Sequence, residues 1–237
     1  MTTPANRISM FTQFKKICVD AVEPGRVGRF WAAALDQRWQ PDDRGEGGLV
    51  DRHGRVTVWF NRVAEPRTVK HRVHLDLYAG SLADLTVLGS TVVLPQGDDR
   101  QWTMMADPEG GEYCAFLRDE VPDDRLHGLV VDSVEPGSQA RWWAGVLGGR
   151  VVDDARGFST VEGIHGLEGV TFDFVPVPEP KTAPNRVHWD LVIDDVGRLV
   201  SHGATRVRAR GGDIDWDVMA DPEGNEFCAF HSPWTYA

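Results

Sequence analysis

Two strand-like segments each place a histidine and an aspartate two residues apart, at His74–Asp76 and His188–Asp190. Residues two apart on a strand project from the same face, so each aspartate could orient its histidine for acid–base chemistry. The alternative is structural, because Asp20 and Asp132 occupy the same strand position in two segments that lack the histidine. We expect the aspartates to cap turns or helices, and we leave both interpretations open for the histidines.

A second pair of candidate segments is Met105–Phe116 and Met219–Phe230, which are nearly identical. Counted from one residue earlier, ten of thirteen positions match at an offset of 114 residues. Each copy contains Asp-Pro-Glu-Gly, which favours a turn, and then continues as a short strand. One face of that strand carries a glutamate and a cysteine, at Glu112–Cys114 and Glu226–Cys228. The glutamates either bind a polar group of a ligand or lie in water at the mouth of a pocket.

These residues lie in four repeated units, each with the pattern of a strand, a helix and three further strands. The aspartates of the opening strands follow one another at steps of 56, 56 and 58 residues, and the repeated closing strand indicates two copies of a larger domain. We expect domains at 15–118 and 127–231, after a loose leader at 1–14. The turn-rich segment Asp119–Asp124 should join the domains, while Ala64–Thr68 and Pro178–Thr182 should join the units within each domain.

Charge and cysteine content exclude several classes of function. The 237-residue chain has 36 acidic and 25 basic residues and a net charge of −11, which disfavours nucleic acid and anionic membranes as partners. No segment has the length and hydropathy of a signal peptide or a membrane span, and three cysteines are too few for a disulfide framework. We expect a cytoplasmic protein whose partner is a small molecule. The sequence leaves a homodimer open.

Several separated motifs resemble one known superfamily. They are Val177–Thr182 (Val-Pro-Glu-Pro-Lys-Thr), Asn185–Leu191 (Asn-Arg-Val-His-Trp-Asp-Leu) and Asp221–Cys228 (Asp-Pro-Glu-Gly-Asn-Glu-Phe-Cys). Together with the paired units they resemble the vicinal oxygen chelate superfamily, which includes glyoxalase I, extradiol dioxygenases and bleomycin-resistance proteins. The resemblance covers nearly all of residues 15–231. It implies an α+β fold of two tandem glyoxalase-like domains, each with two paired βαβββ units that form a curved sheet, helices outside and a ligand site on the concave face.

The resemblance also implies where a metal would bind. In metal-using members the ligands come from the opening and last strands of each unit, positions that correspond here to Cys18, His74, Val130 and His188 and, late in the first and third units, to residues near Asn61 and Val175. The glutamate that usually closes the last strand is replaced by Cys114 and Cys228. Among these, Cys18, His74 and Cys114 form a set that suits zinc. The alternative is that the cysteines are small buried hydrophobic residues. We expect no metal in either domain.

The resemblance places a ligand site in each domain. The first would be lined by Trp59, Asn61, His74, Tyr78 and Cys114, and the second by Asp173, Val175, His188, Val192 and Cys228. Because the first set is richer in aromatic and polar groups, we expect it to be the main site. Trp102 and Trp216, which repeat at an offset of 114, either anchor the closing strand or form a pocket wall.

Two functions follow from these observations. The first, which we favour, is binding of a small aromatic or carbonyl-containing molecule without a metal, as in the drug-sequestering bleomycin-resistance proteins, with or without acid–base catalysis. The alternative is a metal-dependent lyase, isomerase or dioxygenase with its site in the first domain. Fold alone does not choose between them.

Overall fold

The computed structural model describes residues 12–98 and 100–232. Within them all four expected units are present. Unit 1 contains β1 (Thr12–Ala21), α1 (Pro24–Ala34), β2 (Arg38–Pro41), β3 (Gly47–Val50) and β4 (Val56–Arg62). Unit 2 contains β5 (Val73–Ala79), α2 (Leu82–Val87), β6 (Thr91–Leu94), β7 (Thr103–Ala106) and β8 (Glu112–Leu117). Of the expected leader, Thr12–Phe14 belong to β1, and residues 1–11 lie outside the described part of the chain.

The second half of the chain repeats this order. Unit 3 contains β9 (Leu126–Ser133), α3 (Pro136–Leu147), β10 (Arg150–Asp153), β11 (Ser159–Glu162) and β12 (Thr171–Pro176). Unit 4 contains β13 (Val187–Ile193), α4 (Val196–Ser201), β14 (Thr205–Arg208), β15 (Trp216–Ala220) and β16 (Glu226–His231). The predicted pattern of one strand, one helix and three strands is therefore confirmed in every unit.

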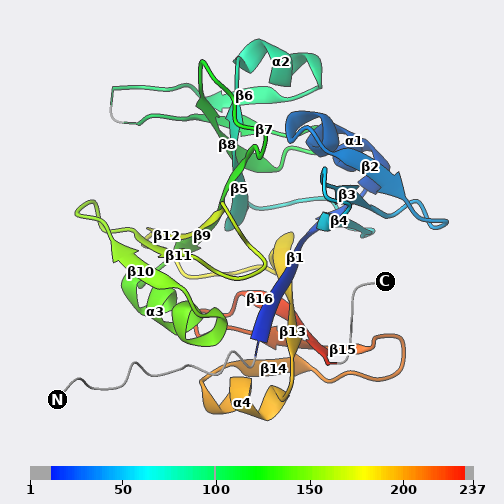
Figure 1. Ribbon diagram of the computed structural model, residues 1–237, viewed down its shortest axis with the longest axis vertical. Coiled ribbons are helices and arrows are strands. Elements are labelled where there is room, and N and C mark those ends of the chain that lie inside the picture. Colours follow the sequence, from blue (N-terminus) through cyan, green and yellow to red (C-terminus); the bar gives the residue numbers. More distant parts are fainter. Residues whose placement is uncertain (1–11, 99, 233–237) are drawn as a thin grey trace.

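The strands form two eight-stranded sheets (Figure 1). Sheet A has the order β14-β15-β16-β13-β1-β4-β3-β2, and sheet B has the order β10-β11-β12-β9-β5-β8-β7-β6. The expected α+β class, built from paired βαβββ units, is confirmed. The partner of each unit differs from the prediction, because unit 1 shares sheet A with unit 4 and unit 2 shares sheet B with unit 3.

The connections explain this pairing. At the centre of each sheet two opening strands pair antiparallel, β1 with β13 and β5 with β9. Residues 63–72 and 177–186 therefore cross from one sheet to the other, whereas residues 118–125 stay within sheet B. We expected the opposite, with the segments 64–68 and 178–182 joining two units within a domain and the segment 119–124 joining the two domains. All four opening strands have similar patterns, so the sequence did not specify which of them pair.

Aromatic clusters within the single hydrophobic core nevertheless join the two units of each half. In the first half, Phe30 and Trp31 of α1 pack against Tyr113 of β8, with ring centroids 5.8 and 5.1 Å away. In the second half, Trp143 of α3 packs against Phe227 of β16 at 5.1 Å. Each sheet is thus made across the two halves, while these ring clusters join the two units of one half. The limits 15–118 and 127–231 stay a prediction.

The repeated Asp-Pro-Glu-Gly turn connects the two units of each half. The Asp107 carboxylate accepts hydrogen bonds from the backbone N–H groups of Glu109 and Gly111, both at 2.9 Å. The Glu109 carboxylate in turn accepts from the N–H groups of Val22 and Glu23, just before α1. Asp221 and Glu223 repeat this arrangement before α3. The motif thus has a structural role, since it supplies acceptors to N–H groups at a helix start.

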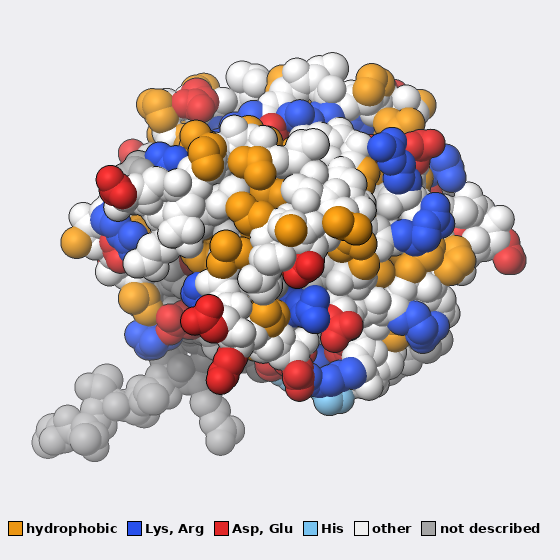
Figure 2. Space-filling view, turned by 90° about the horizontal axis from the view of Figure 1, so that it is seen from above, with side chains coloured by type: hydrophobic (Ala, Val, Ile, Leu, Met, Phe, Trp, Pro, Cys, Tyr) orange, Lys and Arg blue, Asp and Glu red, His pale blue; other side chains and the backbone are white. Residues whose placement is uncertain are grey.

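The hydrophobic core lies on one face of the central strands. Ile17 and Val19 of β1 and Leu75 and Leu77 of β5 belong to it, and the alternate residues of these strands face the other way. No helix among residues 12–98 and 100–232 has the length and hydropathy to cross a bilayer. Figure 2 views the molecule from the end where α2 and β6 lie and shows hydrophobic side chains interspersed with charged ones on that surface.

Candidate functional site

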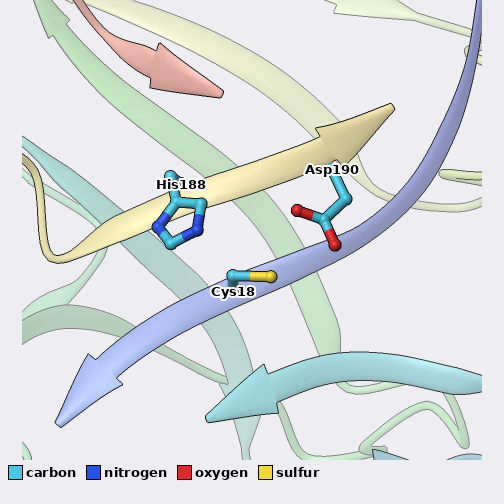
Figure 3. Close-up of side chains that lie close together, drawn as sticks. All are labelled: Cys18, His188 and Asp190. Carbon is cyan, nitrogen blue, oxygen red and sulfur yellow. The ribbon is translucent and has the colours of Figure 1, made fainter. Parts of the chain in front are cut away.

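Sheet A brings together a cysteine, a histidine and an aspartate from two adjacent strands. Cys18 of β1 lies opposite His188 of β13 in the antiparallel register, and Asp190 follows on the same face of β13. Figure 3 shows the Cys18 thiol facing both side chains. One potential ligand atom from each of the three residues lies within 4.8 Å of the other two. Cys18 and Asp190 are each only 3 % exposed.

A lysine shares this face of sheet A. The Lys16 ammonium lies 3.7 Å from the Asp190 carboxylate and 4.9 Å from the centre of the Trp59 ring on β4. Lys16 therefore gives Asp190 a counter-ion within the protein. Asn61, also on β4, donates to the Asp20 carboxylate at 3.0 Å. The predicted ligand-binding residues Trp59 and Asn61 thus belong to the sheet A cluster.

Sheet B holds a matching cluster. His74 Nε2 lies 3.4 Å from Asp76 Oδ1 and 3.6 Å from the Cys114 sulfur. Cys114 is in register with Asp76, as Cys228 is with Asp190 in sheet A. Opposite His74 stands Val130, at the position where sheet A has Cys18. Asp76 Oδ1 is buried and makes no hydrogen bond among the described residues, and its nearest polar neighbour in the cluster is the His74 imidazole.

Aromatic rings flank the sheet B cluster. Tyr78 stacks on His127 with ring centroids 4.5 Å apart. Phe116, two residues beyond Cys114, lies 5.8 Å from the Trp102 ring. The Arg118 guanidinium lies over Tyr78 at 4.8 Å. In sheet A the equivalent tryptophan, Trp216, packs 5.1 Å from Phe230. Both tryptophans therefore contact a phenylalanine of the closing strand.

The predicted groupings of site residues need correction. The five residues expected to line one cup are divided, with Trp59 and Asn61 in sheet A and His74, Tyr78 and Cys114 in sheet B. The expected zinc set is divided in the same way, since Cys18 lies with His188 and Asp190, and His74 lies with Asp76 and Cys114. The prediction assumed that units 1 and 2 share a sheet. His188 and Cys228 lie in sheet A with Trp59, and Trp102 directly precedes β7 of sheet B.

Several residues that lie in or beside the two clusters were not predicted from the sequence. Lys16 could have been found, because Lys16, Cys18 and Asp20 alternate on one strand and must share a face. No pattern in the sequence indicated that His127 would lie beside Tyr78. Asp173, expected beside His188, instead lies in sheet B, where its carboxylate accepts from Thr160 and Thr171. Burial raises the pKa of Asp173.

The three cysteine thiols are buried. Burial raises the pKa of Cys18, and the neighbouring Asp190 carboxylate raises it further. Burial likewise raises the pKa of Cys114, with a further contribution from Asp76, and the pKa of Cys228, with one from Asp190. Because the thiolate is the reactive form, these side chains are poor nucleophiles in the absence of a bound metal.

We therefore expect the native metal-free protein to resist thiol reagents. A disulfide reagent added at pH 8 should modify the three cysteines at least about a hundredfold more slowly than in urea, because burial blocks access and keeps the thiols protonated. The absorbance of the released thiolate measures the rate. Fast modification of one cysteine in folded protein, located by peptide mass spectrometry, would show that its thiol is ionised and accessible.

The ligand number and ligand types of the two clusters can be compared with those of a zinc site, the metal site considered for this chain. Each cluster offers a thiol, an imidazole and a carboxylate, and three such protein ligands fit a catalytic zinc in number and type. The two clusters differ in charge. Sheet A already has the Lys16 ammonium beside Asp190, whereas sheet B leaves Asp76 Oδ1 without a donor. Either set could hold zinc through its own three residues.

Comparison with known protein families identifies the family of this chain. The family described as glyoxalase-like domain matches twice, over residues 16–116 and 128–230. The chain belongs to this glyoxalase-like family. The two matches cover one unit pair each along the sequence, and the predicted superfamily is confirmed. No protein of curated function matches the sequence.

Solved structures support the glyoxalase-like fold. Glyoxalase I from Zea mays superposes with a TM-score of 0.69 at 9 % identity, and 92 % of each chain is covered. A proposed dioxygenase from Bacillus subtilis superposes with a TM-score of 0.61 at 16 % identity, with 93 % of this chain and 85 % of that one covered. At such identities the likeness shows the fold and says nothing about the reaction.

Proposed function

We propose that this glyoxalase-like protein binds a small molecule with an aromatic or carbonyl group against sheet B, without a metal. The observation that carries the proposal is the His74–Asp76–Cys114 cluster beside Tyr78 and Phe116. An apolar wall with a few placed polar groups is the usual composition of a small-molecule site. Sheet A has fewer free polar groups, because Lys16 and Asp190 already neutralise each other.

The polar cluster indicates which groups a ligand should carry. His74 Nε2 faces an aspartate oxygen at 3.4 Å and a thiol at 3.6 Å. A ligand hydroxyl could donate to Asp76 Oδ1, which is buried without a donor among the described residues. A ligand carbonyl could accept from a proton on Nε2, and the same imidazole could transfer that proton. Tyr78 and Phe116 offer faces for an aromatic ring.

A thermal-shift screen of aromatic and dicarbonyl compounds, followed by calorimetry, tests this proposal. We expect His74→Ala to weaken binding of the best compound at least tenfold, which corresponds to about 1.4 kcal/mol. The matched variant His188→Ala, at the equivalent position of sheet A, should change affinity less than about threefold. If only His188→Ala weakens binding, the ligand lies on sheet A and the proposed site is wrong.

A metal-dependent reaction is the second candidate, and one observation favours it. In each sheet three potential ligands of different types converge, and Asp76 Oδ1 of sheet B makes no hydrogen bond within the described residues that a cation would have to displace. Elemental analysis of protein purified without chelator distinguishes the candidates. About one zinc per chain, lost in Cys114→Ala or in Cys18→Ala, would establish a metal site in sheet B or sheet A respectively. We also propose a cytoplasmic location, from the three buried free thiols.

A further inference from the structure

Each sheet has a β-bulge in one of its two central opening strands. In sheet A, Phe14 and Lys16 of β1 lie opposite two adjacent residues of β13, so Lys15 is an extra residue in the strand register. In sheet B, His127 is the extra residue of β9, opposite β5. A bulge redirects a side chain that regular alternation would send to the other face. The two bulges therefore give Lys15 and His127 matching places in the two sheets.

The bulge directs Lys15 to the same face of sheet A as Lys16. Lys15 Nζ lies 3.5 Å from the centre of the Phe230 ring, and Lys16 Nζ lies 4.9 Å from the centre of the Trp59 ring. Along β16 and β4 these rings alternate with residues of the hydrophobic core, so both rings point away from the core. The same face carries the Cys18 cluster drawn in Figure 3, and we call it the cluster face of sheet A.

The cluster face near Lys15 is aromatic and within reach of solvent. Phe230 packs beside Trp216 with ring centroids 5.1 Å apart. Lys15, Trp59 and Trp216 are all partly exposed. An apolar surface with a few placed polar groups suits a small organic molecule. Such a molecule would meet the Lys15 amine beside two aromatic rings.

The surroundings of Lys15 favour a nucleophilic amine. Burial lowers the pKa of Lys15, and the adjacent Lys16 ammonium lowers it further. The Asp190 carboxylate and the thiols of Cys18 and Cys228 shift this pKa in the opposite direction and more weakly. The ion pair with Asp190 at 3.7 Å fixes the Lys16 ammonium on the same face. A lysine that is desolvated beside another cation is activated as a nucleophile toward carbonyl compounds.

Sheet B has no amine at the matching bulge. The His127 ring there lies 4.9 Å from Phe116, which corresponds to Phe230 at the offset of 114 residues. An imidazole does not form a stable imine with an aldehyde or a ketone, whereas a primary amine does. The two bulges therefore present different chemistry beside matched phenylalanine rings.

We propose that Lys15 is a covalent carbonyl-binding residue on the cluster face of sheet A, where its amine forms an imine with a small aldehyde or ketone. The neutral amine attacks the carbonyl carbon, and the new C–N bond gives a carbinolamine. The carbonyl oxygen then leaves as water with both hydrogens of the amine, so the step needs neither an oxidant nor a metal. Phe230 and Trp216 favour an aromatic substituent on the carbonyl compound. The site does not depend on the proposed ligand of sheet B.

Reductive trapping of the imine tests this proposal. The full chain is incubated at pH 7 with benzaldehyde and sodium cyanoborohydride, which reduces an imine to a stable secondary amine, and peptide mass spectrometry locates the modified lysines. Lys16, Lys70 and Lys181, which each lie beside a carboxylate, are internal standards. We expect Lys15 to be modified at least about tenfold faster than any of them. Equal or slower modification of Lys15 overturns the proposal.

The variant Lys15→Arg removes the amine but keeps the positive charge over Phe230, so we expect it to lose the fast adduct. Lys70→Arg is the matched control, because it removes an amine between β4 and β5, away from the cluster face. This variant should form the adduct within about twofold of the wild-type rate. If Lys15→Arg still forms as much adduct as the wild type, the aldehyde reacts elsewhere and Lys15 is not the site.

A measurement on the wild type in urea does not depend on the variants folding. Unfolding separates Lys15 from Phe230 and removes the bulge, so all lysines of the chain should then be modified at rates within about threefold of one another. A preference for Lys15 that persists in urea would come from the adjacent lysines in the sequence. That result would contradict a site built by the cluster face of sheet A.

Discussion

Replacing Trp143 with alanine destabilises the protein by about 3–5 kcal/mol, the range for truncating a large aromatic side chain in a core. Trp143 of α3 is fully buried. Its ring lies 5.0 to 5.6 Å from Phe172, Trp189 and Phe227, which belong to β12, β13 and β16. The side chain thus joins unit 3 to unit 4 and contacts a strand of each sheet.

The indole of Trp143 also has a polar role. Its N–H donates to the Asp221 carboxylate at 3.1 Å, and burial raises the pKa of Asp221. That carboxylate is the acceptor at the start of the repeated Asp-Pro-Glu-Gly turn. The alanine variant therefore leaves a cavity and removes one of the donors to a buried carboxylate, and both effects lower the free energy of unfolding.

The neighbouring Trp142 provides the control. It is only partly buried and donates to the His202 carbonyl at 2.8 Å. We expect Trp142→Ala to cost at least about 1.5 kcal/mol less than Trp143→Ala, because less of its surface leaves water on folding. Urea unfolding followed by circular dichroism gives both values. Equal losses would mean that the Trp143 ring is not packed more tightly in the core than the Trp142 ring.

Replacing Gly166 with alanine is the second change with a large expected effect. Gly166 lies between β11 and β12 with φ of +92°, and an added Cβ would stand 2.3 Å from the backbone oxygen of Phe14 on β1. Because β1 belongs to sheet A and β11 to sheet B, the glycine lies at a contact between the sheets. A positive φ costs alanine about 1–2 kcal/mol, and overpacking costs about 1–3 kcal/mol more.

Gly163 separates these two contributions. It has φ of +73° and nothing within 4 Å of an added Cβ, so Gly163→Ala should show the backbone cost of about 1–2 kcal/mol alone. The expected difference between the variants is the cost of pushing β1 away from this loop. If both variants lose the same stability in urea unfolding, the loop does not touch β1 as described.

The sequence determined the units and their chemistry. Because successive residues of a strand point to opposite faces, it predicted that His74 and Asp76 project from one face, and the structure places His74 Nε2 3.4 Å from Asp76 Oδ1. The near-identical segments that contain Cys114 and Cys228 showed that the chain repeats itself, and the structure gives both cysteines the same register against Asp76 and Asp190. These are local properties, because a strand and its turn depend on neighbouring residues.

Only the tertiary structure decided which residues share a site. Cys18 lies beside His188, 170 residues away, because β1 pairs with β13 and not with β5. Nothing in the sequence distinguished between these pairings, because the opening strands of all four units have equivalent patterns and each could pair with another. The same choice divided the expected zinc set and placed the segments 63–72 and 177–186 on opposite sides of one cavity of about 480 Å³. Long-range pairing depends on how whole units pack, and residue spacing within a unit does not determine it.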